Sequence, residues 1–576
     1  MSACAARLCG TEVVPRCLSA LGQLFRGRYL FAAPSGKKGN CSGSFAFGRL
    51  KSSYKKKGVC LMFTKILLLA IFFAVTIWVG VYFRKRAADV SGFVLGGRAV
   101  GPWLTAFAYG TSYFSAVVFV GFAGQFGWRF GLSATWIGLG NAIIGSLLPW
   151  VILGRRTRVM TRHLGSATMP EFFASRYGST ALKIAASIIV FVFLIPYTAS
   201  LYNGLSRLFA MAFNIDFTIC IIAMAVLTGV FVIAGGYFGT AVNNFIQGII
   251  MLVGIAAVIA AVLGSRGGFI ASLDQLARVE DAAVSNTPGV FASFFGPDPL
   301  NLLGVVLLTS LGAWGLPQMV GKFYAISSEK AIFKGTVIST LFAVVIAGGS
   351  YFLGSFGRLY SGEIDVASQG FDAIIPAMIS GLSDLLIGLI VIMVLAASIS
   401  TLSALVMASA STFILDFLKG HIIKNMDDKR QLISIRFLVV VFIAISSVIA
   451  IFQYRYGIAF IAQLMGISWG ALAGSFLAPF LYGLYWKRVS KISVWCSFLF
   501  GSLLMIANML FRSSFPVILQ SPINSGALAM LAGLIIVPLV SIFSPKPAAE
   551  QVESCFACYD ETVTVKVLQD LGADNA

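Results

Sequence analysis

Thirteen long apolar runs occupy most of this 576-residue sequence, and they limit its possible folds more than any other feature. A helix needs about 20 residues to cross a bilayer, and each run is of that order or longer. Backbone groups in hydrocarbon must bond within their own segment, so each run is predicted to be a helix. We therefore expect an all-α polytopic membrane protein with 13 transmembrane helices. The runs are 62–83, 101–125, 131–154, 182–212, 217–235, 240–264, 300–322, 332–356, 384–412, 432–452, 457–484, 492–511 and 525–543.

The composition excludes the soluble classes of protein. Apolar residues make up 58% of the chain and charged residues 11%, whereas soluble chains have about 45–50% and 25%. The phosphate-binding motif GxxxxGK[ST] does not occur, which argues against an ATP-driven pump. We expect a transporter without enzymatic activity. A lone CxxC, Cys555 with Cys558, has no second pair and is weak evidence for zinc.

The distribution of Lys and Arg predicts the orientation of the chain. One set of alternate loops, together with the C-terminal tail, holds 23 of these residues, and the other set holds 7. Basic loops stay on the cytoplasmic side, so we expect a cytoplasmic C-terminus and a location in the cell membrane (inner or plasma). The net charge of +20 is explained by these loops. Nucleic-acid binding is not expected, because no basic module with interleaved aromatic residues is present.

Residues 1–61 do not fit this orientation. They carry many basic residues and one acidic residue, Glu12, yet thirteen spans leave them outside. We interpret 1–61 as an N-terminal extension that is not native, with Met62 as the natural start; the alternative is a disordered basic tail. The transporter body is then 62–545, followed by a short cytoplasmic tail over 546–576.

Two predicted helices are interrupted near their centres. Residues 108–115 read AYGTSYFS and residues 310–318 read SLGAWGLPQ. Each segment lies in the first helix of a block of five, 101–264 and 300–484. Paired broken helices at corresponding positions of two halves indicate a transporter site, since unwound backbone exposes carbonyls and helix ends. The alternative is that Gly and Pro serve only packing or kinks.

A third segment carries hydroxyl groups on one helix face. Ala397, Ser400 and Thr401 follow the spacing i, i+3 and i+4. Two hydroxyls and a carbonyl suit a hard cation, although such hydroxyls often bond back to the preceding turn. The span centres contain no Asp, Glu or His, which disfavours a proton relay and favours an alkali cation. They also lack Lys and Arg, so a neutral, zwitterionic or monocarboxylate solute fits better than a multiply charged anion.

Several polar and aromatic side chains are candidates to line a solute cavity. Those beside the two breaks are the substrate candidates, and a second group in 182–212 is expected mainly to pack. Asp416, Lys419 and the charged run 427–430 are expected to form a solvated cytoplasmic loop. The substrate candidates are Ser112, Tyr113, Ser115, Trp314, Pro317 and Gln318, and the second group is Tyr197, Tyr202 and Asn203.

Short motifs along the chain resemble the sodium:solute symporter family, which holds sodium/proline, sodium/pantothenate and sodium/glucose carriers. The resemblance covers about 62–545. The motifs are 93–98 (FVLGGR), 101–105 (GPWLT), 169–173 (MPEFF), 176–178 (RYG), 235–236 (GG) with Asn243, Asn244 and Gln247, 400–403 (STLS), and Pro479 with 482–488 (YGLYWKR).

The resemblance implies a LeuT-type inverted five-helix repeat, with one helix before it and two after. It also implies alternating access and a co-transported sodium ion. By motif position, the sodium ligands are the carbonyls of Thr111, Phe114 and Ala397 and the hydroxyls of Ser400 and Thr401.

Departures from the family pattern limit what the resemblance implies. Asn243-Asn244 stands where many members have Thr-Asp, and Ala404 has no hydroxyl, so we expect one sodium per turnover. Thr309 and Ala313 replace a Trp and a Tyr of proline carriers, and Tyr113 replaces an acidic residue. Proline is therefore not the expected substrate.

The predicted function is a sodium-coupled secondary symporter that imports a small amino acid or organic acid. A proton-coupled or uncoupled permease, a channel and a transporter-like sensor are the alternatives. The sequence leaves open the solute's identity and the oligomeric state.

Overall fold

The computed structural model describes residues 66–565, without 214, 420–421, 424–425 and 457–460. The chain divides into two units, 1–59 and 60–576, and every described residue belongs to the second. The predictions for 1–61 and for the end of the tail therefore lie outside the described residues.

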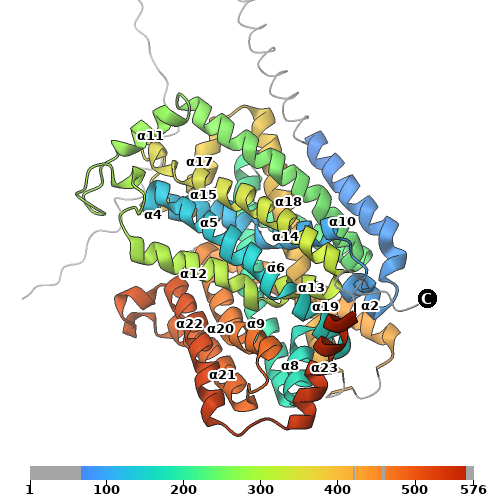
Figure 1. Ribbon diagram of the computed structural model, residues 1–576. Coiled ribbons are helices and arrows are strands. Elements are labelled where there is room, and N and C mark those ends of the chain that lie inside the picture. The colour runs from blue at the N-terminus through green and yellow to red at the C-terminus, as the bar shows by residue number, and fades with distance from the viewer. Residues whose placement is uncertain (1–65, 214, 420–421, 424–425, 457–460, 566–576) are drawn as a thin grey trace, which may run out of the picture. The chain divides into compact units, whose positions relative to one another are not determined.

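The described part of the chain is nearly all helical (Figure 1), as the apolar runs predict. Ten of its helices are long and apolar enough to cross a membrane, or eleven when the bent pair α12 (Pro299–Gly315) and α13 (Pro317–Ala325) counts as one span. The ten are Ile66–Ala87, Val117–Ile152, Thr180–Phe213, Phe217–Ser265, Glu329–Gly354, Asp384–Leu418, Asp428–Tyr456, Ile461–Tyr485, Lys491–Leu510 and Pro522–Phe543.

Two breaks in the helices explain why the structure has up to eleven candidate spans and not the thirteen that were predicted. The predicted spans 217–235 and 240–264 join as α10 (Phe217–Ser265), which contains a non-helical residue, Gly236, with φ 53° and ψ −161°. A positive φ is accessible to glycine at little cost, so Gly236 lets the chain kink between two helical segments. The run 101–125 is also divided. Helix α3 (Pro102–Tyr113) is too short to cross a membrane alone, and the rest of the run belongs to the span Val117–Ile152.

The most enclosed helices are α18 (Asp384–Thr412) and α20 (Ile461–Tyr485). The most apolar windows of these two spans are 83% and 89% buried, against 39% for α10. Helix α18 packs against α9 (Thr180–Phe213), α10 and α3, which brings it next to the first predicted break. The C-terminal helices α21 (Lys491–Leu510) and α22 (Pro522–Phe543) pack on α20 (Figure 1).

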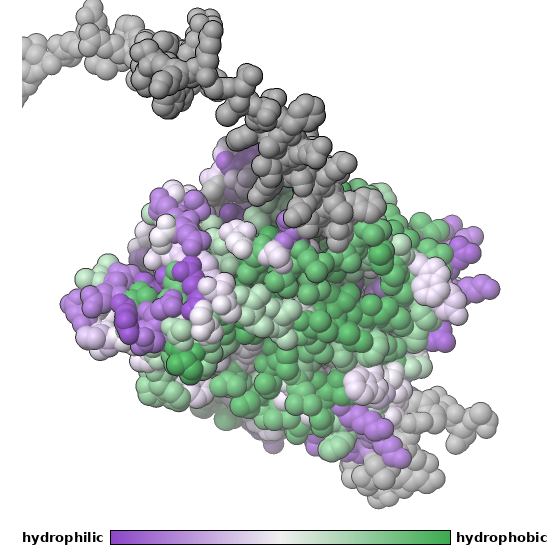
Figure 2. Space-filling model, turned by 90° about the horizontal axis from the view of Figure 1, so that it is seen from above, coloured by the Kyte–Doolittle hydropathy of each residue, from purple (hydrophilic) through white to green (hydrophobic). Residues whose placement is uncertain are grey.

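The outer surface is apolar where a bilayer would contact it. Figure 2 shows a broad field of hydrophobic side chains, with hydrophilic residues gathered toward its edges. Phe333, Phe437 and Ile535 are 74%, 69% and 65% exposed, which in water would be costly. In hydrocarbon the same exposure is favourable, so this surface fits a membrane-embedded body.

Small residues allow close backbone contact between α4 (Ala123–Phe130) and α15 (Gly349–Gly354). A Cβ atom on Gly127 would lie 2.0 Å from the carbonyl oxygen of Gly354. We expect Gly127→Ala to lower stability by about 1–3 kcal/mol, because backbone must move to admit the methyl group. Gly348→Ala is the control, since nothing lies within 4 Å of its added Cβ. Thermal unfolding in detergent compares them, and equal midpoints for both variants and the wild type would refute this packing.

The C-terminal helix α23 (Ala549–Val565) lies against α7 (Gly154–His163) and α8 (Met169–Tyr177). The Arg156 guanidinium carbon is 4.2 Å from the ring centre of Tyr485 and 4.5 Å from that of Tyr559. The Cys555 Sγ lies 3.7 Å from the carbonyl oxygen of Ser175, and burial raises the pKa of its thiol. In the described part of the chain no three His, Cys, Asp or Glu side chains group to hold a metal ion.

Removing the Tyr559 ring should loosen this helix. A cation–π contact is worth about 1 kcal/mol, so we expect Tyr559→Ala to speed alkylation of Cys555 roughly 5-fold, because α23 opens more often. Mass spectrometry of the tail peptide after timed labelling of the folded protein measures the rate. Tyr456→Ala, at a tyrosine that is 68% exposed on another helix, should label like the wild type. Equal rates in all three proteins would argue against docking through Arg156.

Candidate functional site

Helix α3 ends in the middle of the protein. Its last residue is Tyr113, and Phe114 is extended, with φ −105° and ψ 109°. The helical path resumes at Val117–Phe122. The carbonyls in the last turn of a helix have no partner within that helix. The break therefore leaves the Thr111 carbonyl free to meet groups from another helix.

Helix α18 supplies two hydroxyls to this carbonyl. The Ser400 Oγ lies 3.1 Å from the Thr111 oxygen and 2.9 Å from the Ala397 oxygen. The Thr401 Oγ1 lies 3.0 Å from each of the same two oxygens. The side chains of Thr111, Ser400 and Thr401 are fully buried. Four of the five oxygens predicted as sodium ligands are thus gathered in one place, which we call the oxygen cluster.

This geometry is compatible with both sequence interpretations of the α18 hydroxyls. Contacts from Ser400 and Thr401 to the Ala397 carbonyl are the ordinary bonds back to the preceding turn. The contacts to Thr111 cross between helices and are not explained by helix geometry alone. Phe114, the fifth predicted ligand, lines a small and mostly apolar cavity together with Ala397.

The second break lies between α12 and α13. Helix α12 ends at Gly315, Leu316 is extended with ψ 121°, and α13 begins with Pro317 at an angle of 44°. Proline at the first position of a helix costs nothing, because its missing N–H would have no helical partner. The break is therefore encoded locally, as the sequence predicts.

The two broken helices meet through Tyr113. Its hydroxyl donates to the Thr309 carbonyl at 2.5 Å and lies 3.2 Å from the Asn141 Oδ1. Its ring stacks on Trp469, with 5.8 Å between ring centres. The Trp314 Nε1 donates to the Ile144 carbonyl at 2.8 Å. Tyr113 and Trp314 thus have their polar atoms bonded to backbone, which is a structural use of both side chains.

The other substrate candidates lie in different surroundings. Ser115 lines the small cavity beside Phe114, and the buried Ser112 hydroxyl has no hydrogen-bond partner. Pro317 and Gln318 line a larger cavity between α10, α13 and α18, which we call the inner cavity. Neither cavity holds all six candidates. In the second group, Tyr197 packs edge-on to Trp469, and the Asn203 Nδ2 donates to Gln453 at 3.0 Å.

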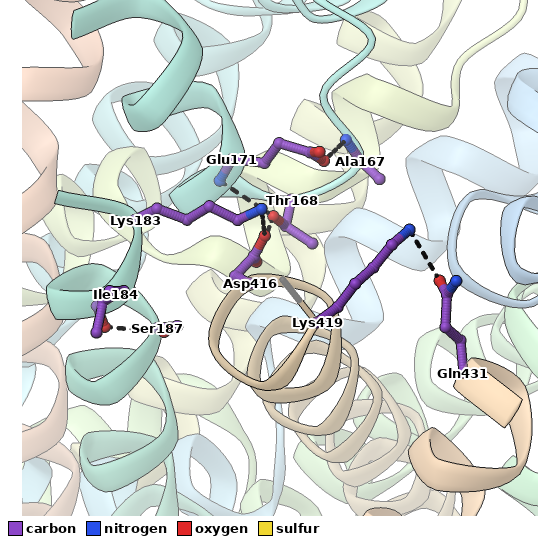
Figure 3. Close-up of polar contacts among 9 residues, drawn as sticks. All are labelled: Ala167, Thr168, Glu171, Lys183, Ile184, Ser187, Asp416, Lys419 and Gln431. Carbon is purple, nitrogen blue, oxygen red and sulfur yellow. Dashed lines mark hydrogen bonds and ion pairs between the residues drawn. The ribbon is translucent and has the colours of Figure 1, made fainter. Parts of the chain in front are cut away.

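Asp416 corrects the expectation of a solvated loop. Its side chain is fully buried in the segment Phe413–Leu418, which continues α18. It accepts a hydrogen bond from the Thr168 hydroxyl at 2.5 Å and pairs with the Lys183 Nζ at 3.4 Å, as Figure 3 shows. Lys419 is also partnered, to Gln431 at 3.2 Å. Burying a carboxylate is costly without such partners, so this contact connects α18 firmly to α8 and α9.

Sequence reasoning missed Lys322 as well. Its position at the end of an apolar run assigned it to a cytoplasmic loop, but it is 5% exposed and lines the inner cavity. Asn244 and Ala404, which stand where family members often place a second sodium site, line the same cavity. A signal was available, because α13 continues past Gln318 and places Lys322 one turn further on the same face.

The sequence matches a known transporter family over most of its length. The sequence model of the family described as the sodium:solute symporter family matches residues 93–501. The osmoregulated proline transporter OpuE of Bacillus subtilis is 27% identical over 490 residues, which cover 84% of this chain and 95% of that protein. Sodium/proline symporter 2 of Staphylococcus saprophyticus is 27% identical over 450 residues, which cover 76% of this chain and 85% of that protein.

Comparison by structure supports the same architecture. A Na+-coupled sialic acid symporter, solved in a substrate-bound outward-open state, superposes with a TM-score of 0.66 at 17% identity. The superposition covers 84% of this chain and 98% of that chain. At this identity the likeness shows a shared fold, which is that of LeuT-like symporters.

Proposed function

The chain belongs to the sodium:solute symporter family, and we propose that it imports a small solute together with one sodium ion per turnover, bound at the oxygen cluster. Members of this family are multi-pass membrane transporters and not enzymes.

One observation carries the proposal. Four oxygen atoms from two separate helices lie within about 3 Å of their neighbours in a fully buried place, without a charged group among them. Sodium, a hard cation, takes oxygen ligands such as these carbonyls and hydroxyls. The Phe114 carbonyl, beyond the break, would complete the set of five. Each hydroxyl would then turn a lone pair toward the ion.

Coupling follows from the position of the oxygen cluster. Three of its ligands, Ala397, Ser400 and Thr401, belong to α18, and the others lie at the end of α3, so the ion would hold the broken helix against α18. A bound ion shifts a conformational equilibrium only by its difference in affinity between the states. A site made from two helices provides a difference in sodium affinity between the states, because its ligands come together only in states where α3 contacts α18. The membrane potential adds roughly 2.3 kcal/mol per sodium for each 100 mV.

The inner cavity supports a stoichiometry of one sodium. Asn244 and Ala404 line it without a negative charge, and Lys322 lines it with a positive one. A second sodium bound there would be repelled by the ammonium group and would lack a carboxylate ligand. These three residues therefore disfavour a second ion.

The proposed topology has thirteen spans. It counts the bend at Gly236 as a boundary between two spans, and it counts 101–125 as one span that is broken after Tyr113 and followed by the span 131–154, as in two inverted repeats over 101–264 and 300–484. The basic loops place the C-terminus in the cytoplasm. The inner cavity then lies on the cytoplasmic side of the oxygen cluster.

The solute is a small neutral, zwitterionic or monocarboxylate molecule. Proline is disfavoured although the relatives are named as proline transporters, because the Tyr113 hydroxyl and the Thr309 carbonyl bond to each other beside the second break.

A screen of purified protein in detergent tests the function. Solutes that raise the melting temperature in sodium chloride but not in choline chloride would support coupled binding. Solutes that stabilise equally in both salts would contradict it.

A further inference from the structure

Lys322 is a buried cation without an anionic partner. Its side chain is 5% exposed, and among the residues that the structure describes no carboxylate pairs with its Nζ. The Nζ lies over the ring of Tyr237, 5.2 Å from the ring centre. A buried ammonium is costly unless it is paired, and a single cation–π contact of about 1–2 kcal/mol does not repay that cost.

The wall around Lys322 carries further unsatisfied polar atoms. The Tyr237 and Tyr324 hydroxyls, the Gln318 Oε1 and the Asn244 Oδ1 are buried and have no hydrogen-bond partner in the described part of the chain. All four side chains line the inner cavity. Buried polar groups are nearly always hydrogen-bonded in native proteins, so four unbonded polar atoms around one cavity indicate a polar occupant.

Helix α18 contributes both apolar and hydroxyl-bearing residues to the lining of the inner cavity. Ala404, Met407 and Ala408 are apolar, and Ser411 and Thr412 carry hydroxyl groups. A cavity lined by an ammonium group, several hydroxyls and some apolar side chains matches a small molecule that has a carboxylate at one end and a short hydrocarbon part at the other. An uncharged solute would leave the ammonium unpaired.

A second cavity adjoins the inner cavity and shares Val94, Leu95 and Ala167 with it. Its charged lining has an excess of cations, which raises the local concentration of anions. The two acidic members are Glu171 and Asp428. The four basic members are Arg98, Arg162, Lys183 and Lys419.

We propose that Lys322 binds the carboxylate of the transported solute on the cytoplasmic side of the oxygen cluster, and so selects carboxylate-bearing solutes. This inference rests on the proposed function and narrows it: the substrate class becomes small amino acids and monocarboxylates, and neutral solutes are excluded. The Tyr237 hydroxyl donates a second hydrogen bond to the same carboxylate. The second cavity, with its excess of basic side chains, then leads the anion toward the cytoplasm.

Paired probes test the proposal in sodium-loaded proteoliposomes. Each carboxylate is compared with an uncharged counterpart of similar shape: propionate with propionamide, and lactate with lactamide. Acetate, pyruvate, pantothenate, L-alanine and L-proline complete the panel. Solid-supported-membrane currents give the half-saturating concentrations. We expect the wild type to respond to at least one carboxylate and to neither amide.

Variants of Lys322 and Tyr237 test whether these two side chains determine the affinity for carboxylates. A charge-assisted hydrogen bond is strong, so Lys322→Gln should raise the half-saturating carboxylate concentration at least 10-fold, while Lys322→Arg should change it less than about 3-fold. Tyr237→Phe, which keeps the ring, should raise it roughly 3–10-fold. Stabilisation by sodium alone should be the same in all variants, which shows that they are folded and retain the oxygen cluster.

The possible failures are distinguishable. Unchanged carboxylate affinity in Lys322→Gln overturns the proposal, and so does a wild type that sodium stabilises but that responds to amides or to no carboxylate. Absence of any stabilisation by sodium in the wild type overturns the proposed function, and this inference with it.

Discussion

The variant Ser400→Ala/Thr401→Ala loses stabilisation by sodium while it still folds. Each hydroxyl contributes one oxygen to the cluster, and a contact to a charged group is worth about 1.5–3 kcal/mol. Removal of one hydroxyl should thus raise the half-stabilising sodium concentration roughly 10–100-fold, and removal of both should abolish the effect at accessible concentrations. Melting temperature titrated with sodium chloride, against choline chloride at equal ionic strength, measures this.

Ser403→Ala is the matched control for that variant. Ser403 lies on α18, is fully buried like Ser400, and its hydroxyl bonds only to carbonyls of its own helix, those of Ile399 and Ser400. Its loss should lower stability slightly and leave the sodium titration unchanged. If the Ser400→Ala/Thr401→Ala variant titrates like the wild type, the assignment of ligands on α18 is wrong. If Ser403→Ala shifts the titration as strongly, the effect is not local to the oxygen cluster.

The second large effect is expected at Asp416. Asp416→Ala leaves the Thr168 hydroxyl without its acceptor and the Lys183 ammonium without its counter-ion, and both lie where α18 meets α8 and α9. Removal of one partner of a buried pair costs about 3–5 kcal/mol; since Lys183 keeps 19% exposure, we expect a value near 3 kcal/mol. Asp416→Asn keeps an acceptor and should lose less.

Thermal unfolding in detergent compares these variants with Asp427→Ala. Asp427 is a carboxylate nearby in sequence that pairs with Arg430, but its side chain is 64% exposed. An exposed pair contributes at most about 1 kcal/mol, so this control should melt close to the wild type. Equal melting temperatures for Asp416→Ala and Asp427→Ala would show that the buried contact of Figure 3 does not stabilise the protein.

The helices were predictable because membrane burial leaves a long apolar signal in the sequence. The breaks were predictable for a related reason: Gly110 and Pro317 interrupt that signal locally, and the structure ends a helix near each of them. The shared face of Ser400 and Thr401 follows from helical spacing alone. That this face meets Thr111, nearly 300 residues earlier in the chain, required the family resemblance.

Charges at the ends of apolar runs were not placed by hydropathy alone. A hydropathy window cannot tell whether a terminal charge points to water or to the interior, and Asp416 and Lys322 were both assigned to loops. Asp416 is bonded by Thr168, 248 residues away, and Lys322 lines a cavity to which α2 (Val90–Leu95), α8, α10, α13 and α18 all contribute residues. The partners of single side chains were equally hidden: Tyr113 and Trp314 stay predicted substrate contacts, and the sequence did not show that both donate to backbone carbonyls.

Binding of radioactive sodium to the purified protein tests the central claim most directly. The account predicts saturable binding of one ion per molecule in the wild type and in Ser403→Ala, and no saturable binding in Ser400→Ala/Thr401→Ala. Two ions per molecule would contradict the stoichiometry, and saturable binding that survives in the double variant would contradict the site itself.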